Sequence, residues 1–501
     1  MSSNLKLMRA ASLAALFFFL NVVFSFFPGA STGEAAVVAA KKLPITQIND
    51  IRFGANAERE RLVIELGAIP EYTIRMEQDG KRYIIELNGV SKRKGKMPVV
   101  KGNILRTVQC RKTPGSHIVT IDLKVPAAQE IIALENPARL VVDFYPLSEK
   151  ENSVAVAQGI RRTDYVKRTL AGSVRGYILT VDPLIYKLDP VLAGDVVPGR
   201  ATVSEMAREY GAVAAINGGY FDWDGTILGM LRIGGQLAGT GYQRRTAVGF
   251  RSDGTGVIGP VEYIGRVTIH SAMVPVSGVN TPRENNSLVI YNSYYGKSTG
   301  TDKFGREFTV IGNKIVDIRQ NDSPIPENGY VISVAGRARD AYTMVRKGDV
   351  VTFYESISTG TAQPAAGGAG AATARSRAVD WKNIPDIMGA GPQLVANGRV
   401  AVTKVEEQFP ADIARGRAPR TAIGMKSDGT WLLVVVDGRQ TNAIGMTLED
   451  LAALMVKYGA VSAVNLDGGG SSEMVINGRI INSPSDGNER RVGSGIVVTR
   501  R

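Results

Sequence analysis

Two residue types that often perform chemistry or cross-link a fold are almost missing from this chain of 501 residues. There is one cysteine, Cys110, so no disulfide can form within the chain and its domains must be held together by their own cores. Only two histidines are present, His117 and His270, which nearly excludes a histidine-rich zinc site and argues against Ser-His-Asp catalysis. Acid–base chemistry is therefore expected from carboxylates.

Signatures of nucleic-acid binding are missing as well. The sequence has no zinc-finger spacing and no basic region followed by heptads, so nucleic acid is not an expected partner. The balance of 60 Lys and Arg against 47 Asp and Glu leaves a net charge of +13. This charge favours an anionic partner such as a phosphate-containing glycan or wall polymer. The length exceeds that of one ordinary core and predicts two or three domains.

Only the N-terminus contains a long apolar run. Lys6 and Arg9 precede apolar residues 10–27, and Pro28 and several small residues follow. This layout predicts a signal peptide over residues 1–40, cleaved before Lys41. The alternative is an uncleaved membrane anchor. In both cases the rest of the chain lies outside the cytoplasm, and a secreted or cell-envelope location is expected.

A β unit occurs twice near the N-terminus. Apolar and polar residues alternate over 61–66 and 82–87, and again over 118–123 and 139–144. The second pair follows the first at a constant shift of 57 residues, from Leu66 to Leu123 and from Leu87 to Phe144. Two such units are predicted to pack as a small all-β sandwich over residues 43–147.

This alternation, together with Asn136-Pro137-Ala138-Arg139-Leu140-Val141-Val142-Asp143, resembles the AMIN domain that precedes wall amidases and secretins. The resemblance implies binding to peptidoglycan or another envelope component. The basic stretch 92–96 is either a contact for anionic wall polymer or a solvated loop. Residues 148–163 are polar and without a pattern, and we expect a linker there.

Two segments in the C-terminal part resemble one another. Tyr-Gly-Ala-Val begins residues 210–217 and residues 458–465, and each segment ends in an asparagine that glycines follow closely. Helices are predicted just before them, over 203–209 and 448–457, the second with a capping-box-like start at Thr447. A strand end followed by glycines is a place where backbone N–H groups can approach a ligand.

A second resemblance pairs residues 245–249 with 420–424. Each begins Arg-Thr-Ala and leads to Ser-Asp-Gly-Thr, which predicts a hairpin turn. The apolar run 431–436, ended by Asp437, predicts a buried strand that places a carboxylate at a sheet edge. The Ala/Gly tract 359–374 predicts a flexible surface insertion. The expected fold of residues 164–501 is α+β, a mixed, β-rich domain with flanking helices.

Five motifs in order resemble the phosphodiester glycosidase family. They are Asn217-Gly218-Gly219-Tyr220-Phe221, residues 420–424, Val436-Asp437-Gly438-Arg439, residues 465–472 and Pro484-Ser485-Asp486-Gly487. The resemblance implies a hydrolase that cleaves a sugar from a glycosyl phosphodiester, here in cell-envelope or extracellular polysaccharide. One lysosomal member contains disulfides that this chain lacks, so its particular substrate is not carried over.

Cleavage of a sugar-1-phosphodiester needs hydrogen-bond donors for the phosphate and one carboxylate to activate water or stabilise a cationic sugar. Asp467 is the first candidate for the catalytic base, followed by Asp437 and Asp486. The arginines are candidate phosphate ligands, and the glycine amides could hold the phosphate oxygens. Asn217 and Asn465 are candidate ligands for sugar hydroxyls. The expected substrate-binding set is Asn217, Gly218, Arg245, Arg420, Thr421, Arg439, Asn465, Gly468, Gly469, Gly470, Ser471 and Ser472.

Each assignment has a plainer alternative. Asp467 can form a tight turn with the glycines after it, and Arg245 and Arg420 can be internal ion-pair partners. The sequence indicates no cofactor; Asp222 and Asp224 resemble a calcium loop only weakly, a turn is the simpler interpretation, and a divalent cation such as calcium stays open. A non-catalytic wall- or carbohydrate-binding protein and an exopolysaccharide-assembly factor are the alternative functions.

Overall fold

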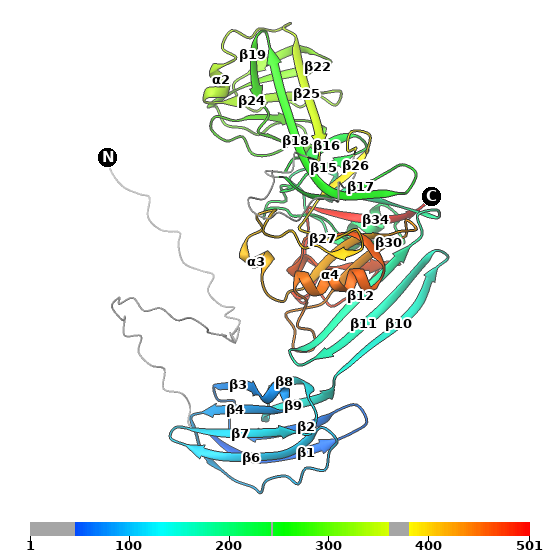
Figure 1. Ribbon diagram of the computed structural model, residues 1–501. Helices are drawn as coiled ribbons and strands as arrows, with labels where there is room; N and C mark the ends of the chain where they lie inside the picture. The colour runs from blue at the N-terminus through cyan, green and yellow to red at the C-terminus, as the bar shows by residue number, and fades with distance from the viewer. Residues whose placement is uncertain (1–45, 242–243, 360–379) are drawn as a thin grey trace, which may run out of the picture. The chain divides into compact units, whose positions relative to one another are not determined.

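The computed structural model describes residues 46–241, 244–359 and 380–501 (Figure 1). The fold is mainly β, and the α-helices of the described residues are short. None of the described helices is long and apolar enough to cross a membrane. The predicted signal peptide 1–40 and nearly all of the predicted insertion 359–374 lie outside the described residues.

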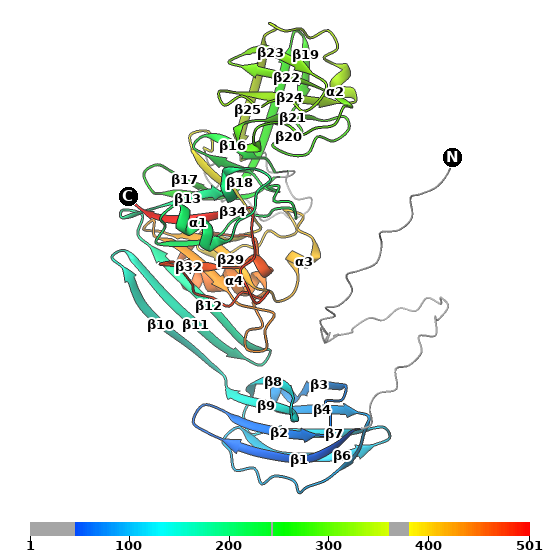
Figure 2. The same ribbon diagram turned by 180° about the vertical axis from the view of Figure 1, so that it is seen from behind.

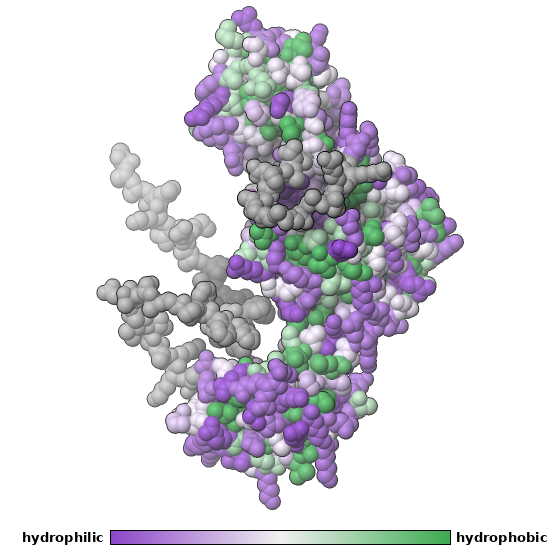
Figure 3. All heavy atoms as spheres, viewed as in Figure 1, coloured by the Kyte–Doolittle hydropathy of each residue, from purple (hydrophilic) through white to green (hydrophobic). Residues whose placement is uncertain are grey.

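The first nine strands form two sheets with one core. Their order is β5-β1-β2-β9-β8 in one sheet and β3-β4-β7-β6 in the other, and buried side chains of both sheets form a single cluster. Hydrophilic residues cover most of the face of this module that Figure 3 shows. The bounds are β1 Thr46–Ala55, β2 Glu60–Leu66, β3 Tyr72–Glu77, β4 Arg82–Asn88, β5 Val90–Arg93, β6 Leu105–Thr113, β7 Ser116–Leu123, β8 Ala127–Glu135 and β9 Ala138–Pro146.

The repeat seen in the sequence is preserved in the strand register. Leu62 pairs with Val142, and the residues 57 positions away, Val119 and Ile85, pair in the other sheet. The residue partners in the β1–β2 pair and in the β6–β7 pair are likewise related by the shift of 57 residues. Strand β2 of the first unit pairs with β9 of the second, and β4 pairs with β7. The two units therefore share both sheets, and neither unit has a sheet of its own.

The linker prediction for residues 148–163 is wrong. Most of this segment forms strands β10 Ser148–Ala157 and β11 Ile160–Thr169, which pair antiparallel. Strand β10 lies at the edge of its sheet and is exposed over most of its length. Since neither of its faces is buried there, its sequence shows no alternation that would mark it as a strand.

Two facing sheets and two helices form the centre of the large domain. An eight-stranded sheet has the order β10-β11-β12-β30-β29-β31-β27-β28, and a five-stranded sheet has the order β13-β34-β14-β32-β33. One core lies between the sheets, α4 covers the outer face of the first sheet, and α1 covers that of the second (Figure 2). The remaining bounds are β12 Gly172–Val181, β13 Tyr186–Leu192, α1 Val203–Glu209, β14 Ala214–Asn217, β27 Gln393–Ala396, β28 Arg399–Val400, β29 Arg420–Lys426, β30 Trp431–Val436, α4 Leu448–Lys457, β31 Ala460–Asn465, β32 Met474–Ile476, β33 Arg479–Ile480 and β34 Ser494–Arg500.

The layers explain the local sequence patterns. Strand β30 is apolar throughout because Leu433 and Val435 face the central core while Val434 and Val436 face α4. Helices α1 and α4 have the predicted bounds, and the Thr447 hydroxyl accepts a hydrogen bond from the Asp450 amide. The capping interpretation of Thr447 is confirmed.

A third group of strands contains the predicted hairpin, since β17 and β18 pair antiparallel across the turn at residues 251–255, but its other strands were not anticipated from the sequence. Strands β18 and β25 pair side by side and connect a sheet of order β16-β15-β26-β17-β18-β19 with a small sheet of order β20-β21-β24-β22-β23. The bounds are β15 Leu231–Ile233, β16 Gln236–Gly239, β17 Arg245–Phe250, β18 Gly256–Ile269, β19 Ala272–Pro275, β20 Gly278–Val279, β21 Leu288–Tyr291, β22 Gly305–Ile311, β23 Lys314–Arg319, β24 Gly329–Ala335, α2 Arg337–Asp340, β25 Val351–Ser358, β26 Asp386–Gly389 and α3 Ala411–Ala414.

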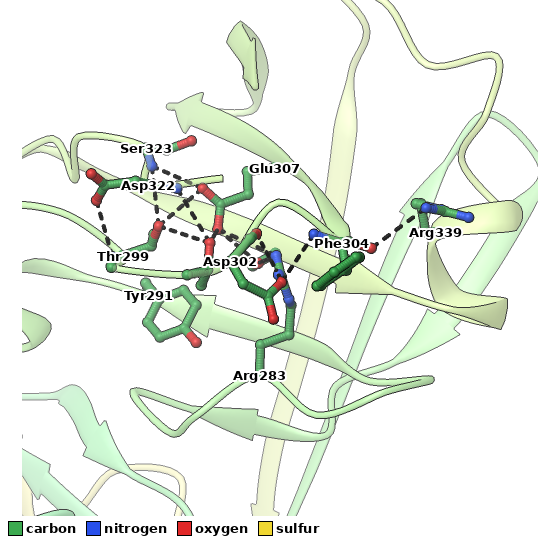
Figure 4. Close-up of polar contacts among 12 residues, drawn as sticks. Arg283, Tyr291, Thr299, Asp302, Phe304, Glu307, Asp322, Ser323 and Arg339 are labelled. Atoms are coloured by element: carbon green, nitrogen blue, oxygen red, sulfur yellow. Dashed lines mark hydrogen bonds and ion pairs between the residues drawn. The ribbon is translucent and has the colours of Figure 1, made fainter. Parts of the chain in front are cut away.

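The small sheet contains a fully buried carboxylate, Glu307 (Figure 4). It accepts hydrogen bonds from the Thr301 and Ser333 hydroxyls at 2.7 and 2.8 Å, and others from the Thr299 hydroxyl and the Ser323 amide. The Arg283 guanidinium lies 3.8 Å from it. Because every oxygen of this carboxylate is satisfied within the protein, we assign Glu307 a structural role in holding the loop at residues 299–304.

Candidate active site

Strand ends from both central sheets meet at one place. Strand β29 runs antiparallel to β30 and β31, so its first residues, Arg420 and Thr421, lie beside the ends of those two strands. Asp437 follows β30, and Asn465 ends β31. Asn217 ends β14 of the facing sheet and contacts Thr421. The topology therefore brings together motifs that are far apart in the sequence.

Asn217 joins the two sheets. Its Nδ2 donates to the backbone oxygen of Asp467 at 2.8 Å, and its Oδ1 accepts from the Thr421 hydroxyl at 2.8 Å and the Glu473 amide at 3.1 Å. The side chain is completely buried. These contacts fit a residue that positions the Asp467 loop, and they do not fit the expected role as a ligand for sugar hydroxyls.

Asn465 and Tyr220 form a second fixed contact. Asn465 Nδ2 donates to the Tyr220 hydroxyl at 2.9 Å and to the Leu466 oxygen at 2.6 Å, and the Tyr220 hydroxyl donates to the Gly391 oxygen at 2.8 Å. Asn465 is also buried, so it too supports the loop after β31. Tyr220 was not among the expected site residues, although it belongs to the motif at residues 217–221.

Asp467 lies two residues after Asn465 and is partly exposed. Its amide donates to the Gly218 oxygen at 3.1 Å, and its Oδ1 accepts from the Gly468 amide at 2.9 Å. Burial raises the pKa of Asp467 from 3.8 to about 6, although the Ser471 hydroxyl, the Gly468 amide and the charge of Arg490 act in the opposite direction. A carboxyl with this pKa changes its protonation state close to neutral pH, as a general base does.

The other two candidate carboxylates are already bound within the protein. Asp437 is buried, and it accepts from the Ser483 amide at 2.8 Å and from the Tyr177 hydroxyl at 3.3 Å. Asp486 is exposed and pairs with Arg490, at 2.6 Å between Oδ2 and Nη2. Burial raises the pKa of Asp437 above its ordinary value. Both carboxylates hold the segment 483–490, which leaves Asp467 as the candidate best placed for chemistry.

The three candidate arginines differ in what they contact. Arg420 is buried and donates to the backbone oxygens of Met446, Ile413 and Gly416 at 3.0–3.2 Å, so it is not the ion-pair partner considered above. Arg439 is exposed, and a Cβ built on Gly469 would lie 3.2 Å from its Nη1. Arg245 stacks on the Phe409 ring, with Cζ 4.1 Å from the ring centroid.

The glycines after Asp467 do not offer the expected cradle. The Gly468 amide donates to Asp467 Oδ1, and the Gly469 amide donates to the Pro419 oxygen at 2.9 Å. Two of the three amides are therefore already used, and phosphate has to be held by other groups. The hydroxyl of Ser472 is buried without a hydrogen-bond partner among the described residues, and the hydroxyl of Ser471 faces the Asp467 carboxyl.

Two glutamates beside this loop were missed. Glu473, directly after Ser472, is buried and contacts Glu489, and its Oε1 has no hydrogen-bond partner in the described part of the chain. Burial, with the neighbouring Glu489 as the second cause, raises the pKa of Glu473 to about 9. Glu473 is therefore neutral at pH 7. The sequence offered only its place at the end of the glycine-serine run as a signal.

No metal cluster is found among residues 46–241, 244–359 and 380–501: no three His, Cys, Asp or Glu side chains are grouped to hold an ion. The weak calcium-loop candidates form a local turn. Asp222 accepts from the Trp223 amide and Asp224 from the Thr226 amide, and the Asp222 amide donates to the Thr226 oxygen. This geometry matches the turn interpretation.

Comparison with known proteins supports a glycosidase domain. Residues 304–499 match the model of the phosphodiester glycosidase family. The prophage-derived uncharacterized protein YomE of Bacillus subtilis is 43% identical over 81 residues, which are 16% of this chain and 13% of that protein. Human N-acetylglucosamine-1-phosphodiester alpha-N-acetylglucosaminidase is 45% identical over 67 residues, 13% of each chain. The chain thus spans a small part of the length of these relatives.

One solved structure extends the similarity of fold to most of the chain. The crystal structure of a hypothetical protein from Synechocystis has a TM-score of 0.61 and 22% sequence identity, and the alignment covers 91% of this chain and 81% of that one. At this identity the match shows the fold alone. A shared fold does not by itself determine function.

Proposed function

We propose that this protein is an exported hydrolase that removes a sugar from a glycosyl phosphodiester in cell-envelope or extracellular polysaccharide. The glycosidase domain extends over residues 164–501 in this proposal, beyond the matched range 304–499. The observation that supports it most directly is Asp467, a carboxyl with a pKa of about 6 that has no ion-pair partner among the described residues. The named activity of the human relative points to the same bond.

The proposed reaction breaks the bond between C1 of the sugar and the phosphate oxygen. Water adds to C1, and its proton passes to the Asp467 carboxylate. The bonding electrons leave with the phosphate oxygen, which gives a phosphate monoester. Because such a monoester is a good leaving group, strong general-acid assistance is less necessary than in ordinary glycoside hydrolysis. One carboxylate and an anion-binding group are then sufficient.

Export and wall binding complete the proposal. The signal-peptide pattern at residues 1–40 supports a secreted or envelope location, and the β1–β9 module is proposed to bind peptidoglycan. The positive net charge of +13 suits an anionic wall polymer. The module has a core of its own, which fits a separate binding function.

The test is sugar release from a panel of sugar-1-phosphodiesters, including UDP-N-acetylglucosamine, by the chain that starts at Lys41. Asp467→Asn is expected to lower the rate by about 100-fold or more. Asp428→Asn, in an exposed hairpin turn, is the matched control and should keep full activity. Full activity of Asp467→Asn would remove Asp467 from the proposal. No release by the unmodified chain, with wall polymer still bound, would favour a non-catalytic binding protein.

A further inference from the structure

A small cavity lies next to the Asp467 loop, residues 466–472, and the site described above does not include it. Its lining includes Tyr220, Met230, Arg245, Tyr263, Gly389 and Ala390. We infer that this cavity is the subsite for the phosphate of the substrate, and that Arg245, not Arg420, is the cation that binds it. This inference rests on the proposed function and specifies which residues recognise the anionic part of the substrate.

The contacts of the two arginines separate their roles. Arg420 is 3% exposed and donates to three backbone oxygens, so its guanidinium has little left to offer a ligand. The Arg245 guanidinium has no hydrogen bond or ion pair with any described residue, and its contact is the stack on Phe409. Stacking holds the guanidinium by its face and leaves its N–H edge available, which is the geometry that binds a phosphate through two parallel bonds.

A buried carboxylate holds this stack in place. Glu407 accepts from the amide and the hydroxyl of Thr246, at 2.8 and 2.7 Å, and from the Gln393 amide at 2.9 Å. Thr246 follows Arg245 in β17, and Phe409 lies two residues after Glu407. The same contact therefore fixes both partners of the stack before a ligand arrives, which reduces the entropy lost on binding.

Tyr263 supplies a second group for an anion. Its hydroxyl is buried without a hydrogen-bond partner in the described part of the chain, while the Tyr220 hydroxyl of the same cavity already donates to Gly391. A buried hydroxyl without a partner is costly, and an acceptor oxygen of a bound phosphate would satisfy it. Arg245 and Tyr263 both line this cavity.

The cavity adjoins the strand that leads to Asp467, because Tyr220, which lines the cavity, accepts a hydrogen bond from Asn465 at 2.9 Å. Burial raises the pKa of the Tyr220 phenol, the charge of Asp467 raises it further, and the charges of Arg420 and Arg245 lower it. Tyr220 therefore lies within the electrostatic reach of both the candidate base and the candidate phosphate ligand.

Binding of methyl phosphate to the chain that starts at Lys41 tests the subsite without any need for turnover. We expect Arg245→Gln to weaken this binding at least about tenfold, and Tyr263→Phe to weaken it several-fold. Thermal unfolding of Tyr263→Phe should occur at the same or a higher temperature, because the change removes a buried hydroxyl that bonds to nothing in the described chain. Arg399→Gln, which removes an exposed positive charge from β28, should bind as the unmodified chain does.

Enzyme turnover provides a second, independent test of the role of Arg245. Arg245→Gln should lower kcat/KM by about 100-fold on a sugar-1-phosphodiester and by less than about threefold on a neutral aryl glycoside of the same sugar. Loss of phosphate binding in Arg439→Gln but not in Arg245→Gln would overturn the assignment. If the unmodified chain binds methyl phosphate through Arg245 but releases no sugar, the proposed function fails and the anion site stands.

Discussion

At the scale of single residues, the pKa of Asp467 determines how activity should depend on pH. A base must be ionised to accept a proton, and the pKa of Asp467 is about 6. We therefore expect kcat/KM on a sugar-1-phosphodiester to fall about tenfold per pH unit below pH 6 and to level off above pH 7. A rate profile from pH 4.5 to 8.5 checks this. The Asp428→Asn control should follow the same curve, and a flat profile across pH 6 would speak against Asp467 as the base.

Glu473 makes a separate prediction about stability. Its folded-state pKa of about 9 lies above its ordinary value of 4.5, so the folded protein holds this proton more tightly than the unfolded chain does. The contribution of Glu473 to the unfolding free energy is fully present below about pH 4 and is lost steadily as the pH rises towards 9. Glu473→Gln stays neutral and avoids this loss. Its unfolding free energy should exceed that of the unmodified chain at pH 7, and by more at pH 9.

Asp467→Asn is the comparison variant for that experiment. The folded-state pKa of Asp467 in the unmodified chain is about 6. The unfolding free energy of Asp467→Asn relative to the unmodified chain should therefore increase between about pH 4 and 6 and then stay constant. Urea denaturation at pH 5, 7 and 9 separates the two variants. An unfolding free energy of Glu473→Gln that runs parallel to that of the unmodified chain from pH 7 to 9 would show that Glu473 is ionised in the fold.

At the scale of elements, patterns with a buried face were predictable and those without one were not. Helices α1 and α4 have strong caps and one apolar side, and both were predicted to the residue. Strand β10 is exposed and pairs only as an edge strand, so it was mistaken for a linker. The small sheet β20–β24 was also not anticipated: β21 and most of β24 are buried on both faces, so their apolar runs lack the alternation that identifies a strand.

The duplicated module offers a matched test at the same scale. Ile64 and Ile121 are related by the shift of 57 residues, and both are completely buried in the module core. Because the register repeats, we expect Ile64→Ala and Ile121→Ala to destabilise the module by similar amounts, about 3 kcal/mol each. Chemical denaturation of the two variants measures this. Losses of unfolding free energy that differ by more than about twofold would mean that the two halves pack differently in spite of their common register.

At the scale of the whole molecule, the motifs were visible in the sequence but their roles were not. The contact between Asn217 and Asp467 joins residues 250 positions apart, and only the fold reveals that the Asn217 amide supports the loop from inside. The arginines illustrate the same limit. Arg245 and Arg420 begin similar Arg-Thr-Ala segments, yet one donates to three backbone oxygens and the other stacks on an aromatic ring. Packing, which no local pattern specifies, separates a structural arginine from one available to a ligand.

The division of labour between the two parts of the chain leads to the last prediction. The core of the β1–β9 module consists of residues 48–144 alone, while the strand ends of the site belong to residues after 210. A chain of residues 148–501 keeps β10 with its partner β11 and should cleave a soluble sugar-1-phosphodiester within about twofold of the full chain. It should lose its retention on insoluble cell-wall material, measured by sedimentation. Residues 44–147 alone should sediment with the wall, and equal retention of the 148–501 chain would instead place wall binding in the glycosidase domain.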